Sequence, residues 1–120
     1  MFCRPITIEN SRLLKLFNRI FSINFEGFTF YPFILLSGEN TEKDIYNHEL
    51  IHIQQTEETF FIGYILILVT QYTFNLCKYR NLYKAYRNLA FEKEAYDNMK
   101  NLDYLKSRKK FAWLTYFKCK

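Results

Sequence analysis

The chain has 120 residues, a formal net charge of +5 at pH 7, and a composition that is 49% hydrophobic and 20% aromatic. This length supports one domain with a modest core, and the apolar content excludes an intrinsically disordered chain. The cysteines Cys3, Cys77 and Cys119 are odd in number and far apart, which excludes a disulfide framework and a Cys-x-x-Cys metal clip. A reducing compartment fits best. The first residues contain no apolar run long enough for a signal peptide, so we expect a cytoplasmic protein.

The N-terminal third predicts one helix and one strand. Apolar residues recur at helical spacing between Asn10 and Phe21, with Asn10 or Ser11 as the N-cap. Residues 28–36 follow a glycine and are rich in aromatic and branched side chains, which is typical of a strand. Pro32 lies within this strand and cannot donate to a β-ladder. We therefore expect an edge strand or a strand with a break.

A second helix is expected to begin at Thr41, which together with Asp44 resembles a capping box. This helix carries the pattern H-E-x-x-H at residues 48–52, which uses both histidines of the chain. Residues four apart lie on the same face of a helix, one turn from each other. His48 and His52 can therefore direct two ring nitrogens at a single metal ion.

The spacing of this motif is typical of a zinc-dependent peptidase. Zinc held by three protein ligands keeps a fourth position for water and lowers the pKa of that water to about 7. Glu49 follows the first histidine and is the candidate general base. The alternatives are a structural histidine pair and a Glu49 side chain that faces solvent. Gln55, one turn beyond His52, is a candidate hydrogen-bond partner for a ligand or a substrate and equally a candidate solvent-facing residue.

Residues 60–77 form the most apolar run of the chain. Its uninterrupted part ends at Val69, whereas a membrane-spanning helix needs about 20 predominantly apolar residues. We therefore predict a buried core helix. The alternative is a membrane-embedded or interfacial helix, through which the protein would associate with a membrane peripherally.

The C-terminal part is basic, with twelve bases and four acids from Lys78 to Lys120. Helical spacing continues from Leu82 to about Ser107, and the aromatic segment 111–117 could cover a groove. Bases interleaved with tyrosines can stack on nucleic-acid bases. Here the tyrosines have helical spacing, which favours packing. We expect a solvated basic face and no nucleic-acid partner. Tyr86, Arg87 and Asn88 are candidate oxyanion donors, with helix packing as the alternative.

A zinc site built on this motif needs a third ligand, and a Glu pair stands out in the segment F-E-K-E-A-Y at residues 91–96. Together the two motifs resemble gluzincin-type zinc metallopeptidases. The prenyl-protease and heat-shock-protease group and the antibiotic-sensor metallopeptidases have related motifs. More similar still are short bacterial proteins with H-E-x-x-H-x-x-Q followed by Y-R-N-x-x-F-E-x-E-A-Y. The resemblance covers residues 41–97, roughly half of the chain.

This resemblance implies that Glu92, three residues before the alanine, is the third zinc ligand. Glu94 is the fallback, because two residues along a helix point to different faces. The family usually has an aspartate directly after that alanine, where it can steady a ligand histidine. This chain has Tyr96 there and Asp97 one position later.

From these observations we expect a single α+β, mostly helical, zincin-like domain over residues 1–120. A short edge strand or small sheet lies over the H-E-x-x-H helix. Residues 41–97 carry the motifs, and 98–120 form a basic aromatic segment. The expected function is hydrolysis of peptide bonds in a peptide or protein substrate, with Zn²⁺ held by His48, His52 and Glu92 and with Glu49 as the base. The alternative is an inactive metal-binding or interaction module for a protein or membrane partner.

Overall fold

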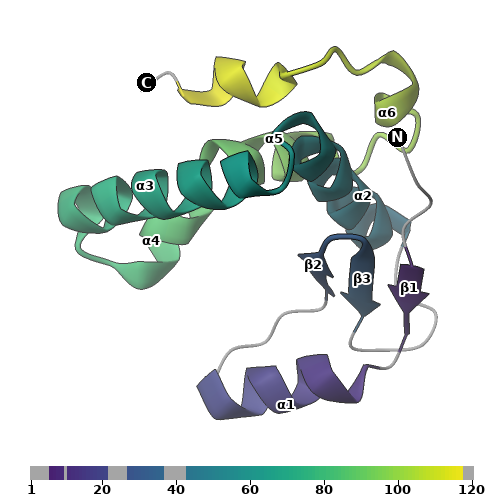
Figure 1. Cartoon of the computed structure of the whole chain (residues 1–120), viewed down its shortest axis with the longest axis horizontal. Helices are drawn as coiled ribbons and strands as arrows, with labels where there is room; N and C mark the ends of the chain where they lie inside the picture. The colour runs from purple at the N-terminus through teal and green to yellow at the C-terminus, as the bar shows by residue number, and fades with distance from the viewer. Residues whose placement is uncertain (1–5, 10, 22–26, 37–42, 118–120) are drawn as a thin grey trace.

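The computed structural model describes residues 6–9, 11–21, 27–36 and 43–117. The described chain is mostly helical and contains one small sheet, which confirms the expected α+β class. The elements follow one another as β1 (Ile6–Ile8), α1 (Arg12–Phe21), β2 (Gly27–Phe30), β3 (Phe33–Leu36), α2 (Lys43–Glu58), α3 (Ile62–Tyr79), α4 (Leu82–Arg87), α5 (Ala90–Asn98), α6 (Tyr104–Ser107) and the 3₁₀ helix η1 (Ala112–Phe117). Figure 1 shows the sheet between α1 on one side and the later helices on the other.

The sheet has the strand order β1-β3-β2, with β1 parallel and β2 antiparallel to β3. The predicted strand over 28–36 is thus two strands, because the chain turns at Tyr31 and Pro32. This is the break expected from the proline, which has no N–H to donate. The sequence analysis did not predict β1.

Helix α1 begins where its sequence predicts. The Ser11 hydroxyl accepts a hydrogen bond from the Leu14 backbone N–H at 3.2 Å and so acts as the N-cap. Asn10, the other cap candidate, lies outside the described residues, as does Thr41 of the expected capping box. The Ser11 N–H donates to the Leu36 carbonyl at 2.7 Å, which ties the start of α1 to β3.

Helix α2 is the central element of the fold, because it contacts β2, α3 and α5. One of its faces packs on the sheet, where Ile53 joins Ile34 and Leu36 of β3 in a fully buried cluster. The buried polar side chains of α2 include the residues of the H-E-x-x-H motif. Of these, His48 and His52 contact Glu92 of α5, whereas Glu49 contacts Thr29 of β2.

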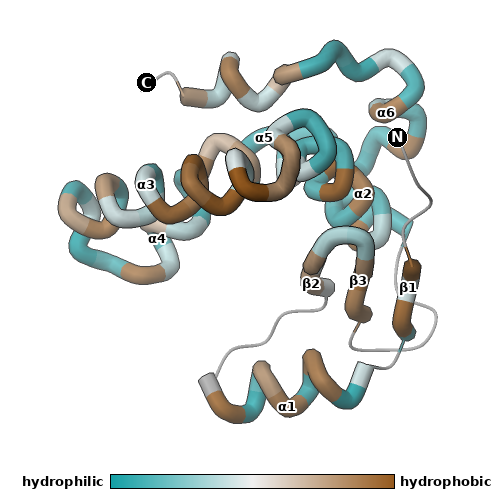
Figure 2. Tube along the Cα trace, viewed as in Figure 1, coloured by the Kyte–Doolittle hydropathy of each residue, from teal (hydrophilic) through white to brown (hydrophobic). Residues whose placement is uncertain are grey.

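Helices α3 and α4 form a hairpin that extends away from the sheet (Figure 1). Arg80, in the left-handed region at φ 52°, ends α3, and Asn81 caps α4 by accepting from the Lys84 N–H at 3.0 Å. The predicted helix over the apolar run is present, but the prediction that it is buried is wrong. Within α3, only Asn75 is buried, and many of its apolar side chains are exposed. Figure 2 shows how hydrophobic the residues of this helix are. Helix α4 and a few residues of α2 and α5 cannot cover all sides of an 18-residue helix.

Taken singly, no helix of the described chain has the length and apolar content to span a membrane. Only α2 and α3 together have that length and apolar content, and the chain bends by 110° between them.

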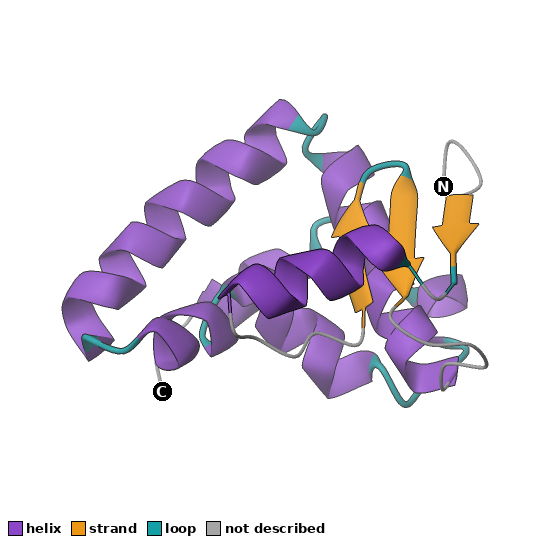
Figure 3. Ribbon diagram, turned by 90° about the horizontal axis from the view of Figure 1, so that it is seen from below, coloured by secondary structure: helices purple, strands orange, loops and turns teal. Residues whose placement is uncertain are grey.

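The C-terminal segment packs on α5. Figure 3, seen from below the view of Figure 1, shows the three strands together among the helices. Trp113 lies in an edge-to-face contact with Phe91 of α5, with ring centroids 5.0 Å apart. The Phe91 ring also stacks on the ring of Tyr64 in α3, with centroids 4.4 Å apart. Phe91 of α5 therefore contacts both α3 and η1.

Arg108 forms a buried ion-pair network that holds this segment in place. Its guanidinium donates to both carboxylate oxygens of Glu94 at 3.0 and 3.1 Å through Nε, and to Glu58 through Nη1 and Nη2. Glu58 Oε2 also accepts from the Trp113 indole N–H at 3.1 Å. The three charged side chains are at most 7% exposed, so the network depends on all of its members.

We predict that Arg108→Ala lowers the free energy of unfolding by about 3–5 kcal/mol, because it leaves two buried carboxylates unpaired. Urea denaturation of the full chain measures the change. Lys106→Ala is the matched control, since Lys106 pairs with Asp103 at 3.1 Å in full contact with solvent. It should cost less than about 1 kcal/mol. Equal effects of the two substitutions would contradict the role given to Arg108.

Candidate metal centre

Helices α2 and α5 bring three potential metal ligands together at their contact. His48 and His52 lie one turn apart on the polar side of α2, and Glu92 comes from the first turn of α5. All three side chains are buried. Each offers one ligand atom, and these atoms lie within 4.8 Å of one another. They form a group that is able to hold a metal ion.

The separations of the ligand atoms suit a small tetrahedral cation. The Nε2 atoms of His48 and His52 are 3.1 Å apart, and each lies 3.0–3.2 Å from an oxygen of Glu92. Tetrahedral zinc with bonds of about 2.0–2.1 Å requires ligand atoms about 3.3 Å apart. His48 approaches Glu92 Oε2 and His52 approaches Oε1, and Oε2 is buried without a well-formed hydrogen bond to a described residue. The donor set and its spacing therefore fit a metal ion.

Gln55 determines which nitrogen of His52 faces the site. Its amide Nε2 donates to the Phe91 carbonyl at 3.0 Å, which fixes the orientation of the amide. The amide oxygen is then 2.8 Å from His52 Nδ1 and accepts its proton. In the neutral ring this hydrogen bond leaves the lone pair on Nε2, the nitrogen that faces Glu92 and would bind an ion. Of the two interpretations of Gln55 from the sequence, the structure supports the partner of a ligand.

His48 is positioned by aromatic packing. The ring of Tyr96 lies edge-on against the imidazole with centroids 4.5 Å apart, and Arg87 lies 3.6 Å over the other face of Tyr96. His48 Nδ1 is buried without a hydrogen-bond partner among the described residues. Tyr96 therefore supports His48 through a ring contact.

Glu49 is buried beside this group and contacts β2. The hydroxyl of Thr29 donates to the Glu49 carboxylate. Gly27, two residues earlier in the same strand, allows this close approach: a Cβ there would lie 3.0 Å from Glu49 Oε1. Glu49 is 5% exposed, so it is not a solvent-facing helix residue.

A pocket of about 380 Å³ opens beside the metal group. Glu49, His52 and Glu92 contribute its polar lining. The remaining walls are mainly apolar or aromatic and come from β2, α3 and α4: Gly27, Phe28, Thr29, Tyr64, Ile65, Leu68, Tyr72, Tyr86 and Leu89. The volume falls in the range of small-molecule and peptide side-chain sites.

The charges of the site are strongly coupled. Burial raises the pKa of Glu49, and the neighbouring histidines offset this only in part. Burial opposes a charge on His52, but Glu92 outweighs it and raises the pKa of His52 to about 9. Burial also opposes the charge on Glu92, yet the two imidazoles hold its pKa well below its usual range. Without an ion, a proton on His52 thus balances the Glu92 carboxylate, and a bound cation would replace that proton.

The two glutamates of α5 point to different neighbours. Glu92 faces the histidines, whereas Glu94 is paired with Arg108 and also lies 3.5 Å from the Gln55 amide. Among the candidate oxyanion donors, Tyr86 lines the pocket. Arg87 stacks on Tyr96, and Asn88 donates to the Lys84 carbonyl.

The sequence analysis missed Gly27, Thr29 and Tyr64 as site residues. A signal for the first two was present in the strand pattern. Gly27 and Thr29 alternate with the exposed Phe28 and Phe30, and small residues on one face of a strand permit close contact with a helix. Tyr64 lies in the apolar run, and only the hairpin geometry directs it to the pocket.

Comparison of the chain with models of protein families, with curated proteins and with solved structures found no match. The resemblance to gluzincin-type metallopeptidases therefore remains a prediction from the two motifs. The function has to be inferred from the geometry of the site.

We predict that the purified chain binds one zinc ion and that Glu92→Gln loses most of it. Glu49→Gln is the matched control and should retain the metal, because Glu49 is not one of the three converging ligands. Elemental analysis of the dialysed proteins measures the stoichiometry. A chelator should lower the melting temperature of the wild type, since an ion that binds only the folded state stabilises it. Full zinc in Glu92→Gln together with its loss in Glu94→Gln would mean that the third ligand is misassigned.

We further predict that Gln55→Leu weakens zinc binding about 10- to 100-fold, because His52 loses the acceptor that fixes its tautomer. Competition with a fluorescent chelator gives the dissociation constant. Thr56→Val is a suitable comparison, since Thr56 is buried on the same helix and donates to the His52 carbonyl rather than to its ring. Similar affinities for Gln55→Leu and wild type would refute the orienting role of Gln55.

Proposed function

We propose that the protein is a zinc-dependent peptidase in which Glu49 acts as the general base. The observation that carries this proposal is the position of Glu49. A purely structural metal site made of His48, His52 and Glu92 has no need of a second acidic side chain that is not a ligand, and burying one costs free energy. Here the carboxyl group lines the same pocket as His52 and Glu92 and is held in place by Thr29.

The residues present suit zinc in kind as well as in spacing. Two imidazoles and one carboxylate are a known ligand set of catalytic zinc. Such an ion would supply a Lewis acid for a substrate carbonyl and would lower the pKa of a coordinated water.

Glu49 would accept the proton of the water that attacks the carbonyl carbon and would pass it to the amine when the C–N bond breaks. Tyr86 lines the same pocket, and its hydroxyl stays protonated because burial and Glu92 raise its pKa. It is therefore a candidate hydrogen-bond donor to a developing oxyanion.

The sheet offers a place for an extended substrate. Among the described strands, β2 pairs only with β3, so its other edge is open for backbone hydrogen bonds. The same strand contacts Glu49 through Thr29. A peptide added to this edge would run beside the pocket that contains the metal group, which is the usual geometry of β-strand addition.

The alternative is an inactive module in which the ion only stabilises the fold. This alternative predicts a closed site with a fourth protein ligand or a plug from residues 111–117. In the described part of the chain, no fourth ligand joins the metal group, and the pocket lining includes no residue of η1. These observations favour the enzyme.

We predict chelator-sensitive cleavage of an unbiased peptide mixture by the wild type with added zinc. Glu49→Gln should reduce the rate by about 10²- to 10⁴-fold, the usual effect of losing a general base, while it retains zinc. Mass spectrometry of the products measures the cleavage.

Two outcomes would contradict the proposal. Equal cleavage by wild type and Glu49→Gln would point to a contaminating enzyme. No cleavage by the zinc-loaded wild type, across many peptides, would favour the inactive module.

A further inference from the structure

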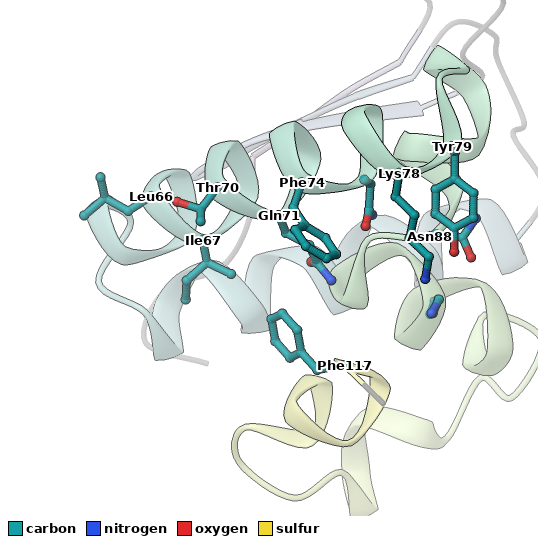
Figure 4. A pocket seen from close by; sticks show the side chains of 11 residues that line it. Leu66, Ile67, Thr70, Gln71, Phe74, Lys78, Tyr79, Asn88 and Phe117 are labelled. Carbon is teal, nitrogen blue, oxygen red and sulfur yellow. The ribbon is translucent and has the colours of Figure 1, made fainter. Parts of the chain in front are cut away.

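A second and larger concavity lies on the other side of α3, away from the metal group. This groove has a volume of about 560 Å³ and is lined by Leu66, Ile67, Thr70, Gln71, Phe74, Asn75, Lys78, Tyr79, Asn88, Lys93 and Phe117. Figure 4 shows Phe117 of η1 opposite the middle of α3, so that the groove has a wall on each side. None of the three candidate metal ligands lines this groove, and neither does Glu49.

The polar amides of the groove are already engaged with the backbone. Gln71 Oε1 accepts from the Ala90 N–H at 3.0 Å, and Asn75 Nδ2 donates to the Ala85 carbonyl at 3.1 Å. These bonds fix the two side chains against α4 and α5. The surface left for a ligand along the length of the groove is therefore mainly apolar, formed by Leu66, Ile67, Phe74 and Phe117.

The charged groups of the groove are both basic. Lys78 lies near the C-terminal end of α3, beside Tyr79 and Asn88 in Figure 4, and Lys93 comes from α5. Leu66 marks the opposite, apolar end. At a rise of about 1.5 Å per residue, the twelve residues from Leu66 to Lys78 span about 18 Å. The lining is thus apolar along most of its length, with Lys78 at one end and Lys93 contributed from α5.

This arrangement suits a single chain better than a bilayer. A lipid surface contacts protruding side chains, whereas Ile67, Gln71 and Asn75 are recessed in the groove and half-buried or buried. Leu66 and Phe74, which are 63% and 65% exposed, line the groove together with these recessed residues, whereas the exposed Ile62 and Val69 do not line it. A recessed apolar track of this length can hold one extended acyl chain.

We propose that this groove binds a single-chain amphipathic anion, with its acyl chain along Leu66 to Phe74 and its anionic headgroup at Lys78 and Lys93. Apolar burial provides the affinity, and each buried methylene contributes about fourfold to the binding constant. The lysines select the charge of the headgroup. The site is independent of the metal centre and of the proposed peptidase activity.

The test is a titration of the full chain with dodecanoate below its micellar concentration. Trp113, the single tryptophan, lies 5.7 Å from the Phe117 ring and provides the fluorescence signal, which calorimetry can check. We expect saturable binding of one dodecanoate per chain and much weaker binding of octanoate. Dodecyltrimethylammonium, which has the same chain and the opposite charge, should bind at least about tenfold more weakly.

Two matched substitutions locate the site. Phe74→Asp places a charge in the groove, and Val69→Asp places the same charge on the same helix outside it. Phe74 is 65% exposed and Val69 56%, so both variants should fold. Only Phe74→Asp should abolish dodecanoate binding. The double change of Lys78 and Lys93 to Glu should reverse the headgroup preference, whereas Lys100→Glu, on an exposed residue outside the groove, should not.

Three results would overturn the proposal. The first is equal binding by Phe74→Asp and Val69→Asp, which would place the ligand elsewhere. The second is equal affinity for the anionic and cationic amphiphiles. The third is binding to anionic phospholipid vesicles without binding to monomeric dodecanoate, which would identify the apolar face of α3 as a membrane contact.

Discussion

The carboxylate of Glu92 lies between the ring nitrogens of His48 and His52, and all three groups are buried with Glu49 close by. Burying this many ionisable groups in a chain with so small a core is costly unless a proton or a cation balances the charge. The surrounding structure supplies the polar support that remains necessary. Gln55 fixes one imidazole, Thr29 fixes the glutamate, and the contact of α2 with α5 holds Glu92 against the histidines.

Much of this arrangement is encoded locally and could be predicted. The histidine spacing needs only a helix, Ser11 caps α1 through its own hydroxyl, and Pro32 breaks the strand because it has no N–H. The choice between Glu92 and Glu94 is different. Both are buried, and their spacing leaves the assignment open until the partner of Glu94 is known. That partner is Arg108, fourteen residues later, and its approach depends on the fold of the C-terminal segment.

For the apolar run at residues 60–77, the prediction of a buried helix was wrong. Its composition suggests a buried helix, yet burial depends on how much chain is available to cover it. Here α4 and a few residues of α2 and α5 cover parts of α3 and leave a broad apolar face exposed. Two cavities adjoin different sides of α3, one towards the metal group and one towards Phe117. In a chain of this size the same helix forms walls of two separate cavities, so a substitution in α3 has to be assigned to one of them by its direction on the helix.

The three candidate ligands are unevenly distributed along the chain. His48 and His52 belong to one helix, and Glu92 follows only after the whole α3–α4 hairpin. Fraying at the tip of the hairpin would leave the donors in place, whereas separation of α5 from α2 would remove one of three. The dissociation rate of a bound ion would then measure how often α5 separates from α2 while the rest of the chain stays folded.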